Sequence, residues 1–237
     1  MAQRARRVAR RLGLDVRRYR SERAADVRRQ KQLEQHAIDL VLDIGANEGQ
    51  FGSELRAAGY RGRIVSFEPL ADEYAALERR VGKDDRWECR RLAIGERSGA
   101  TEIHVSRNRQ SSSLLPILER HLSALPSSAY VGTETVEMAR LDDLVDELLG
   151  ADGDAFLKLD AQGYEKRILA GAEATLRRCP LLETELSLVP LWEGQPLLGE
   201  MVERLRGLGY SCLGFHEVLS DPETAQVLQV DGLFARL

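Results

Sequence analysis

Short apolar runs recur along the chain, and stretches with helical spacing separate them. Apolar runs without polar alternation are typical of strands buried on both faces of a parallel sheet. Strands that alternate with helices predict an α/β fold. The predicted strands span residues 40–44, 63–67, 87–93, 155–159 and 181–186, and the predicted helices span about 51–58, 69–81, 141–149, 166–177 and 197–208.

Two regions depart from this alternation. Residues 101–105 and 133–138 alternate polar and apolar side chains, as half-buried strands do. We interpret residues 100–140, approximately, as an inserted β-extension with a long loop, and such loops are often binding loops, lids or disordered. Residues 210–215 and 227–235 predict a terminal hairpin. The pattern as a whole therefore predicts a seven-stranded, mostly parallel sheet with an antiparallel end.

Charge divides the chain into two parts. The net charge is −4, but residues 4–31 carry twelve Lys or Arg against three Asp or Glu, which is +9 and leaves −4 − 9 = −13 for the rest. We predict a basic helical arm over residues 1–37 and one domain over 38–237, a length that can bury a sizeable core. Apolar residues at helical spacing support a short amphipathic helix in the arm; they are Val8, Leu12, Val16 and Tyr19.

The arm could contact a nucleic acid, an anionic membrane or an acidic partner. Its apolar face is thin and lacks Trp and Phe, so we favour a solvated helix that packs on the domain or on a neighbouring subunit of a homo-oligomer. The mild net charge gives no overall nucleic-acid signal. No apolar run is long enough for stable membrane insertion, and no secretory signal is evident. Three scattered cysteines without a C-x-x-C motif favour a reducing, cytoplasmic location.

The first strand ends in a glycine-spaced turn with the sequence DIGANEG. Gly45 and Gly49 allow positive φ and close approach of a ligand, and the following helix offers unpaired N–H groups near Ala46 and Asn47. Asp43 would repel a phosphate, but it could hold an ammonium or a sulfonium group. The turn is also not the G-x-G-x-x-G that seats a pyrophosphate.

The second strand ends at Glu68, where an acid is placed to accept hydrogen bonds from ribose hydroxyls. Pro69 then opens the next helix. An adenosine with cationic groups and no phosphate fits these residues, so S-adenosyl-L-methionine is a better candidate than NAD. Ala93 and Ile94 follow the third strand and could line the adenine, or they could simply belong to the core.

Asp160 closes the fourth strand on the same rim. Its carboxylate could accept a proton, help to hold a divalent metal, bind the methionine end of the cofactor or cap the next helix. His104 could be a base, although a lone His on a strand is more often structural. Glu183 and Glu185 share one face of a buried strand, so they need partners or line the site. The histidines make no ligand-spaced pair, which disfavours zinc.

The inserted loop is assigned to the acceptor pocket. Polar side chains there could hydrogen-bond a sugar or merely cap turns; they are Arg107, Asn108, Ser111, Ser112 and Ser113. Trp192 lies in a loop on the same rim and could stack on a sugar or cover the cleft.

Five segments resemble the FkbM-type methyltransferases, over roughly residues 41–185; they are VLDIGANEGQFG, RIVSFEP, LAIGERSG, SSSLL and FLKLDAQGYEKRILAGA. The resemblance implies a class I methyltransferase (Rossmann-like) fold with helices on both faces of the sheet. It also implies transfer of a methyl group from S-adenosyl-L-methionine to a hydroxyl of a sugar or a polyketide-type product.

The family pattern K-x-D-x-x-G-x-E is matched by Lys158, Asp160, Gly163 and Glu165. This chain has Gln162 where the family more often has an acid, so a metal site that needs that acid is disfavoured. We assign no metal ligands; magnesium is compatible with the sequence but not indicated.

The function predicted from the sequence is direct methyl transfer to a hydroxyl of a small molecule or a glycan. The candidate bases, in order of preference, are Asp160, His104 and Glu165. The predicted cofactor-binding residues are Asp43, Gly45, Ala46, Asn47, Gly49, Glu68, Pro69, Ala93 and Ile94. The alternatives are an NAD-binding oxidoreductase and a non-catalytic module that joins a larger assembly through its basic arm.

Overall fold

The computed structural model describes residues 21–150 and 153–237. The amphipathic helix predicted for the start of the basic arm lies outside these residues. The arm's last part forms helix α2, Ser21–Gln35, which leads into the first strand.

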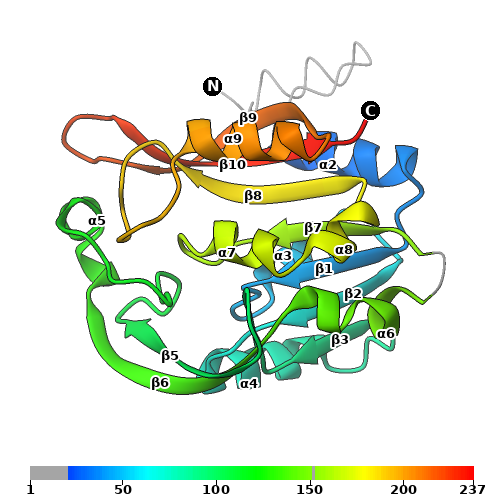
Figure 1. Ribbon diagram of the computed structural model, residues 1–237, viewed down its shortest axis with the longest axis horizontal. Helices are drawn as coiled ribbons and strands as arrows, with labels where there is room; N and C mark the ends of the chain where they lie inside the picture. The colour runs from blue at the N-terminus through cyan, green and yellow to red at the C-terminus, as the bar shows by residue number, and fades with distance from the viewer. Residues whose placement is uncertain (1–20, 151–152) are drawn as a thin grey trace, which may run out of the picture.

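A seven-stranded sheet forms the centre of the molecule, in the order β3-β2-β1-β7-β8-β10-β9 (Figure 1). β1 pairs in parallel with β2 and β7, whereas β10 pairs antiparallel with β8 and β9. The predicted mostly parallel sheet with an antiparallel end is confirmed. The strands are β1 Leu40–Ile44, β2 Arg63–Phe67, β3 Trp87–Arg90, β7 Ala155–Leu159, β8 Leu181–Ser187, β9 Ser211–Ser220 and β10 Val227–Ala235.

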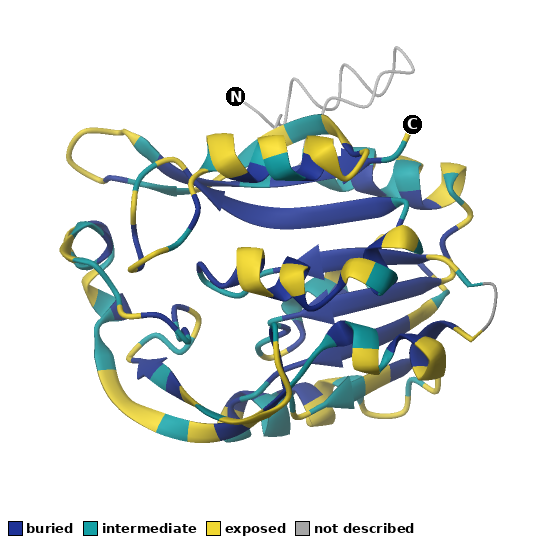
Figure 2. Cartoon of the chain, in the orientation of Figure 1, coloured by how far each residue is buried: buried dark blue, intermediate teal, exposed yellow. Residues whose placement is uncertain are grey.

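Helices cover both faces of this sheet. Successive strand residues point to opposite faces, so Val41 and Leu42 belong to two different apolar clusters. One cluster includes residues of α2, α3 and α4, and the other includes residues of α6, α7, α8 and α9. The central strands are accordingly buried along their length (Figure 2). The remaining helices are α3 Gln50–Ala57, α4 Ala71–Val81, α6 Val145–Leu149, α7 Glu165–Ala170, α8 Glu173–Arg177 and α9 Leu198–Gly207.

The predicted β-extension forms a second sheet of three strands in the order β4-β6-β5. β5 (Gly99–Ser106) and β6 (Tyr130–Ala139) pair antiparallel, and their connection contains helix α5 (Glu119–Ala124) and a 3-10 helix (Pro126–Ser128). In Figure 1 this extension lies to one side of the main sheet, beyond the carboxyl ends of its parallel strands. The predicted long loop therefore has its own ordered elements.

The predicted third strand was too long. β3 stops at Arg90, whose carbonyl accepts a hydrogen bond from Glu68 N at 3.1 Å. The chain then leaves the main sheet, and β4 (Ala93–Ile94) pairs in parallel with β6 of the extension. A tertiary contact between two sheets, which local patterning does not encode, ends this strand.

The helix predicted over 166–177 is divided into α7 and α8. Asp142 causes the division, because its carboxylate accepts hydrogen bonds from Thr175 N at 2.9 Å and from Thr175 Oγ1 at 3.0 Å, at the start of α8. Gly171 also approaches the Gly95 carbonyl so closely that a Cβ there would lie 2.1 Å from it. The predicted helix over 141–149 is likewise a 3-10 turn, Leu141–Asp143, followed by α6.

Helix α2 is fixed to the main sheet by a buried ion pair. The Arg29 guanidinium donates to both carboxylate oxygens of Glu183, at 2.6 Å each, and the two side chains are 8% and 3% exposed. The same guanidinium lies 4.9 Å from the centre of the Phe51 ring. Among the described residues, no helix has the length and apolar character needed to cross a membrane.

Replacing Arg29 with alanine should lower the free energy of unfolding by about 3 kcal/mol, because removing one partner of a buried ion pair leaves the other charge uncompensated. Urea denaturation followed by circular dichroism measures this loss. Lys31→Ala, on an exposed part of the same helix, is the control and should change stability by less than about 0.5 kcal/mol. Equal stability of Arg29→Ala and the wild type would show that the pair does not hold α2.

Candidate active site

A cavity of about 590 Å³ opens where the parallel strands end. This is the edge of an open α/β sheet at which ligands generally bind. Its lining comes from the ends of the central strands, the β-extension, the terminal hairpin and α2. The lining includes Arg29, Gly45, Ala46, Asn47, Glu68, Pro69, Ala93, Ile94, Asn108, Arg109, Ser111, Ser112, Ser113, His121, Lys158, Asp160, Gln162, Glu183, Glu185, His216 and Asp231.

The turn after β1 is held close to the end of β7. A Cβ at Gly45 would lie 1.8 Å from the Asp160 carbonyl oxygen, and Gly45 has a φ of +77°. Only glycine fits this approach and this backbone conformation. Gly45 N and Ala46 N both donate to the Phe67 carbonyl at 3.0 Å. These bonds hold the turn against the end of β2, and the close approach of Gly45 to Asp160 places it beside the end of β7.

Gly49 lies outside the cavity lining, unlike the earlier residues of the turn. It is the N-cap of α3, and a Cβ there would lie 2.8 Å from Leu77 and 3.2 Å from Trp87. It does not line the cavity, whereas Gly45, Ala46 and Asn47 do. Gly49 therefore serves the packing of α3 on its neighbours.

Glu68 lies at the centre of the predicted cofactor site. One carboxylate oxygen accepts a hydrogen bond from Asn47 N at 2.8 Å, and the other accepts one from Leu70 N at 2.9 Å. Each oxygen retains a further lone pair that a ligand hydroxyl could use. Burial raises the pKa of Glu68 to about 7, although the two backbone bonds oppose the rise. The neighbouring Pro69 also lines the cavity.

Asp43 lies beneath the cavity rather than in its lining. Its carboxylate accepts a hydrogen bond from Ser66 Oγ at 2.8 Å, and Ser66 Oγ in turn accepts one from Trp87 Nε1 at 3.0 Å. The residue is 1% exposed. Burial raises its pKa to about 6, against the opposing effects of Ser66 and Lys158. Asp43 thus supports the site through a hydrogen-bonded row across three strands.

Asp160 is the first candidate base, and its side chain lines the cavity. Its Oδ1 accepts a hydrogen bond from Gln162 Nε2 at 2.8 Å, and its Oδ2 lies 4.0 Å from Lys158 Nζ. The side chain remains 39% exposed. Burial raises the pKa of Asp160, and the Lys158 ammonium opposes the rise. Gln162 Nε2 also lies 3.1 Å from Glu185 Oε2, so one amide bridges two acids.

The terminal hairpin supplies two titratable lining residues that the sequence analysis missed. Asp231 Oδ1 lies 3.3 Å from Lys158 Nζ, and Asp231 Oδ2 lies 3.3 Å from His216 Nε2. A lone acid inside the mostly apolar run of β10 was the available signal. Arg29 was also missed, because nothing in the arm's many arginines distinguishes it. The expectation that Glu183 meets an arginine or lines the site agrees with its contact to Arg29 and its place in the lining.

Two of the three candidate bases lie outside the cavity lining. Glu165 Oε1 accepts hydrogen bonds from Ala161 N at 2.9 Å and Gly163 N at 3.2 Å, so the carboxylate caps the turn before α7. Burial raises its pKa to about 7. The His104 ring stacks on Tyr130 with ring centres 4.8 Å apart. Of the three, Asp160 alone is part of the lining.

The remaining predicted residues divide between the lining and the core. Ala93 and Ile94 are buried and line the cavity. Trp192 is fully buried and packs edge-on against His121, with ring centres 4.5 Å apart, so it is a core residue in this structure. The polar loop residues line the cavity with the exception of Arg107. Across residues 21–150 and 153–237, no group of three or more His, Cys, Asp or Glu side chains is arranged to hold a metal ion.

The sheet order and the cavity at its carboxyl edge define a class I methyltransferase-like α/β protein. A solved structure of methyltransferase FkbM from Methylobacillus flagellatus KT matches the fold with a TM-score of 0.51 at 15% identity, covering 83% of this chain and 43% of that one. The family model for the methyltransferase FkbM domain matches residues 43–212. The chain therefore belongs to the FkbM methyltransferase family.

A curated relative is also similar to this chain. It is the 2-O-methyltransferase NoeI of Sinorhizobium fredii (strain NBRC 101917 / NGR234), and it is 28% identical over 172 residues. The match covers 70% of each chain.

The pKa of Asp43 leads to a testable dependence of stability on pH. Because the folded carboxyl has a pKa of about 6 rather than 3.8, it keeps a proton that the unfolded chain releases. Its contribution to the free energy of unfolding should therefore fall as the pH rises from about 4 to 6. In Asp43→Asn the free energy of unfolding should change less with pH over this range. Urea denaturation at several pH values measures it, with Asp39→Asn at an exposed position as the control; unchanged slopes in Asp43→Asn would contradict the assignment.

Proposed function

We propose that this chain transfers a methyl group from S-adenosyl-L-methionine to a hydroxyl of a sugar, a glycan or a polyketide-type product. The observation that carries the proposal is the joint position of Glu68 and the Gly45 turn in one cavity at the edge of the sheet. The membership of the FkbM family supports methyl transfer. The similarity to NoeI, a 2-O-methyltransferase, favours a hydroxyl as acceptor.

The residues present fit this methyl donor. Glu68 offers free lone pairs to the ribose hydroxyls, and Ala93 and Ile94 offer an apolar surface to the adenine. Gly45 leaves the rim open where any side chain would collide with Asp160. The acids of the lining suit the ammonium and the sulfonium, whereas a pyrophosphate would meet them unfavourably. When bound, the donor supplies a methyl group on a sulfonium, an already activated leaving group.

Most of the protein's work is then to position two substrates and to remove one proton. Asp160 is the preferred base, because its carboxylate is in the lining, is partly exposed and has a raised pKa. Gln162 holds the carboxylate in place through the bond to Oδ1. Asp160 would accept the proton of the acceptor hydroxyl during or after formation of the oxygen–methyl bond, as the sulfur–methyl bond breaks and the donor leaves as a neutral thioether. His104 and Glu165 would need a rearrangement to reach a cavity-bound substrate.

The most direct test is incubation with labelled S-adenosyl-L-methionine and a panel of glycans and polyketide alcohols, with and without magnesium. Transfer of label to a hydroxyl supports the proposal. Two rivals predict other outcomes: an NAD-binding oxidoreductase would bind NADH in preference to S-adenosylhomocysteine, and a non-catalytic module would transfer no label to any acceptor.

Glu68→Ala should weaken binding of S-adenosylhomocysteine by about 1–3 kcal/mol, since ribose hydroxyls would lose their acceptor. Isothermal titration calorimetry measures this change. Glu78→Ala, at an exposed position of α4, is the control. Wild-type affinity of Glu68→Ala would remove the assignment of Glu68 to the ribose.

Asp160→Asn should lower the rate of methyl transfer by about 10²-fold or more, the usual contribution of a general base, while S-adenosylhomocysteine still binds. Single-turnover kinetics and calorimetry on the same preparation separate the two effects. Full activity of Asp160→Asn would exclude Asp160 as the base.

A further inference from the structure

The segment 107–113, which we call the roof loop, connects the two halves of the cavity. It follows β5 and contributes Asn108, Arg109 and Ser111 to the lining. One end is tied to α4, beside the cofactor residues that follow β2, and the other end is tied to the turn after Asp160. The loop therefore spans the cavity from the Glu68 side to the Asp160 side.

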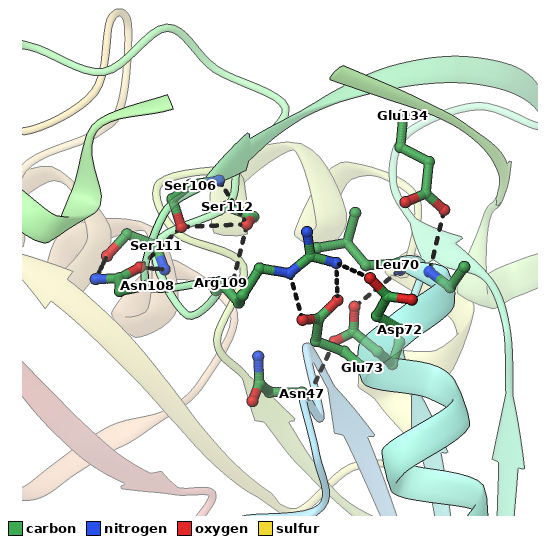
Figure 3. Close-up of polar contacts among 12 residues, drawn as sticks. Asn47, Leu70, Asp72, Glu73, Ser106, Asn108, Arg109, Ser111, Ser112 and Glu134 are labelled. Atoms are coloured by element: carbon green, nitrogen blue, oxygen red, sulfur yellow. Dashed lines mark hydrogen bonds and ion pairs between the residues drawn. The ribbon is translucent and has the colours of Figure 1, made fainter. Parts of the chain in front are cut away.

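The tie to α4 is an arginine–carboxylate fork. Arg109 Nε donates to Glu73 Oε1 at 2.5 Å, and Arg109 Nη2 donates to Glu73 Oε2 at 2.7 Å and to Asp72 Oδ2 at 3.2 Å. Glu73 is 5% exposed and lies five residues after Glu68. Figure 3 shows the Arg109 side chain pointing from the loop toward Glu73 and Asp72. A two-point charged contact of this kind fixes geometry as well as supplying energy.

The second tie is made by Ser113. Its Oγ donates to the Gln162 carbonyl at 2.7 Å, and its N and O atoms both bond to the backbone of His104. Gln162 is the residue whose amide holds Asp160. This end of the roof loop is thus fixed to the segment that carries the preferred base.

Between the two ties, the polar side chains of the roof loop bond to the loop itself and to Ser106, where β5 ends. Asn108 Nδ2 donates to Ser111 Oγ at 3.0 Å, Ser112 Oγ donates to the Arg109 carbonyl at 2.8 Å, and Ser106 Oγ donates to Asn108 Oδ1 at 2.8 Å. Figure 3 shows this group on the opposite side of Arg109 from Glu73. These bonds favour the turn-capping alternative for the loop side chains. The loop is pre-organised and offers a shaped surface more than a set of free donors.

We propose that the roof loop is the cover of the methyl-donor site and that Arg109 is its positioning residue, acting through Glu73. The loop was assigned to the acceptor pocket on sequence grounds, but its anchor is on the donor side. A cover that is already folded adds little ordering cost on binding, and it slows escape of the ligand beneath it. Loss of the Arg109–Glu73 contact should therefore raise the dissociation rate of the donor more than it changes the association rate. This inference rests on the proposed function.

The test compares Arg109→Ala, Glu73→Gln and the double variant in binding S-adenosylhomocysteine, with affinity from calorimetry and dissociation rate from stopped-flow displacement. Arg109→Ala should raise the dissociation rate by about ten-fold, because the loop would lose its anchor on α4 and would open more often over the bound ligand. The double variant should lose no more affinity for S-adenosylhomocysteine than Arg109→Ala alone, since both changes break the same contact. Arg109→Lys should be intermediate, because an ammonium keeps the charge and loses the fork.

Arg120→Ala is the matched control. Arg120 lies in the same extension and pairs with Asp221 at 3.0 Å, and its exposure of 38% is close to the 32% of Arg109. That pair ties the extension to the terminal hairpin, so its loss should leave donor binding within about two-fold of wild type. Thermal melting of every variant accompanies the binding data.

Unchanged affinity and dissociation rate in Arg109→Ala would overturn the inference, and so would additive losses in the double variant. A lowered melting temperature with unchanged dissociation would show a purely structural contact and would also overturn it. Failure of the wild-type protein to bind S-adenosylhomocysteine would instead refute the proposed function, and this inference would fall with it.

Discussion

The site depends on one buried ammonium group. Lys158 Nζ lies 3.3 Å from Asp231 and 4.0 Å from Asp160. Burial alone would lower its pKa, but the surrounding carboxylates, led by Asp231, raise it above the ordinary value. The charge therefore stays on the lysine, and Asp160, which follows β7, can lie close to the acids of β8 and β10. Without this cation, several carboxylates would be buried close together and would repel one another.

The positions of the parallel strands could be predicted because each is buried on both faces and therefore reads as an apolar run. β1, β2 and β7 begin and end where the pattern places them. The early end of β3 and the division of the helix after Gly163 could not be predicted in this way. The end of β3 depends on the pairing of β4 with β6, and the division between α7 and α8 depends on the Asp142 carboxylate. Both features therefore depend on contacts between residues distant in sequence.

The candidate site shows the same division. Gly45, Glu68 and Asp160 stand at the ends of strands, and the general rule for open α/β sheets was sufficient to bring them together. Arg29, His216 and Asp231 come from α2 and the terminal hairpin, whose place against the cavity follows from the packing of the whole chain. Glu165 matched a motif and was a candidate base, but its carboxylate caps the turn before α7. Trp192 was a candidate for stacking on a sugar, but it is buried in the core.

The terminal hairpin contributes His216 and Asp231 to the lining of the cavity. Asp231 contacts Lys158 Nζ and His216 contacts Asp231, and β9 is an edge strand of the main sheet. Substitutions in this hairpin can therefore reshape one end of the cavity, provided that the acid at position 231 is kept beside Lys158. Under the proposed function, exchange of hairpins that keep this acid would be a practical route to altered acceptor preference.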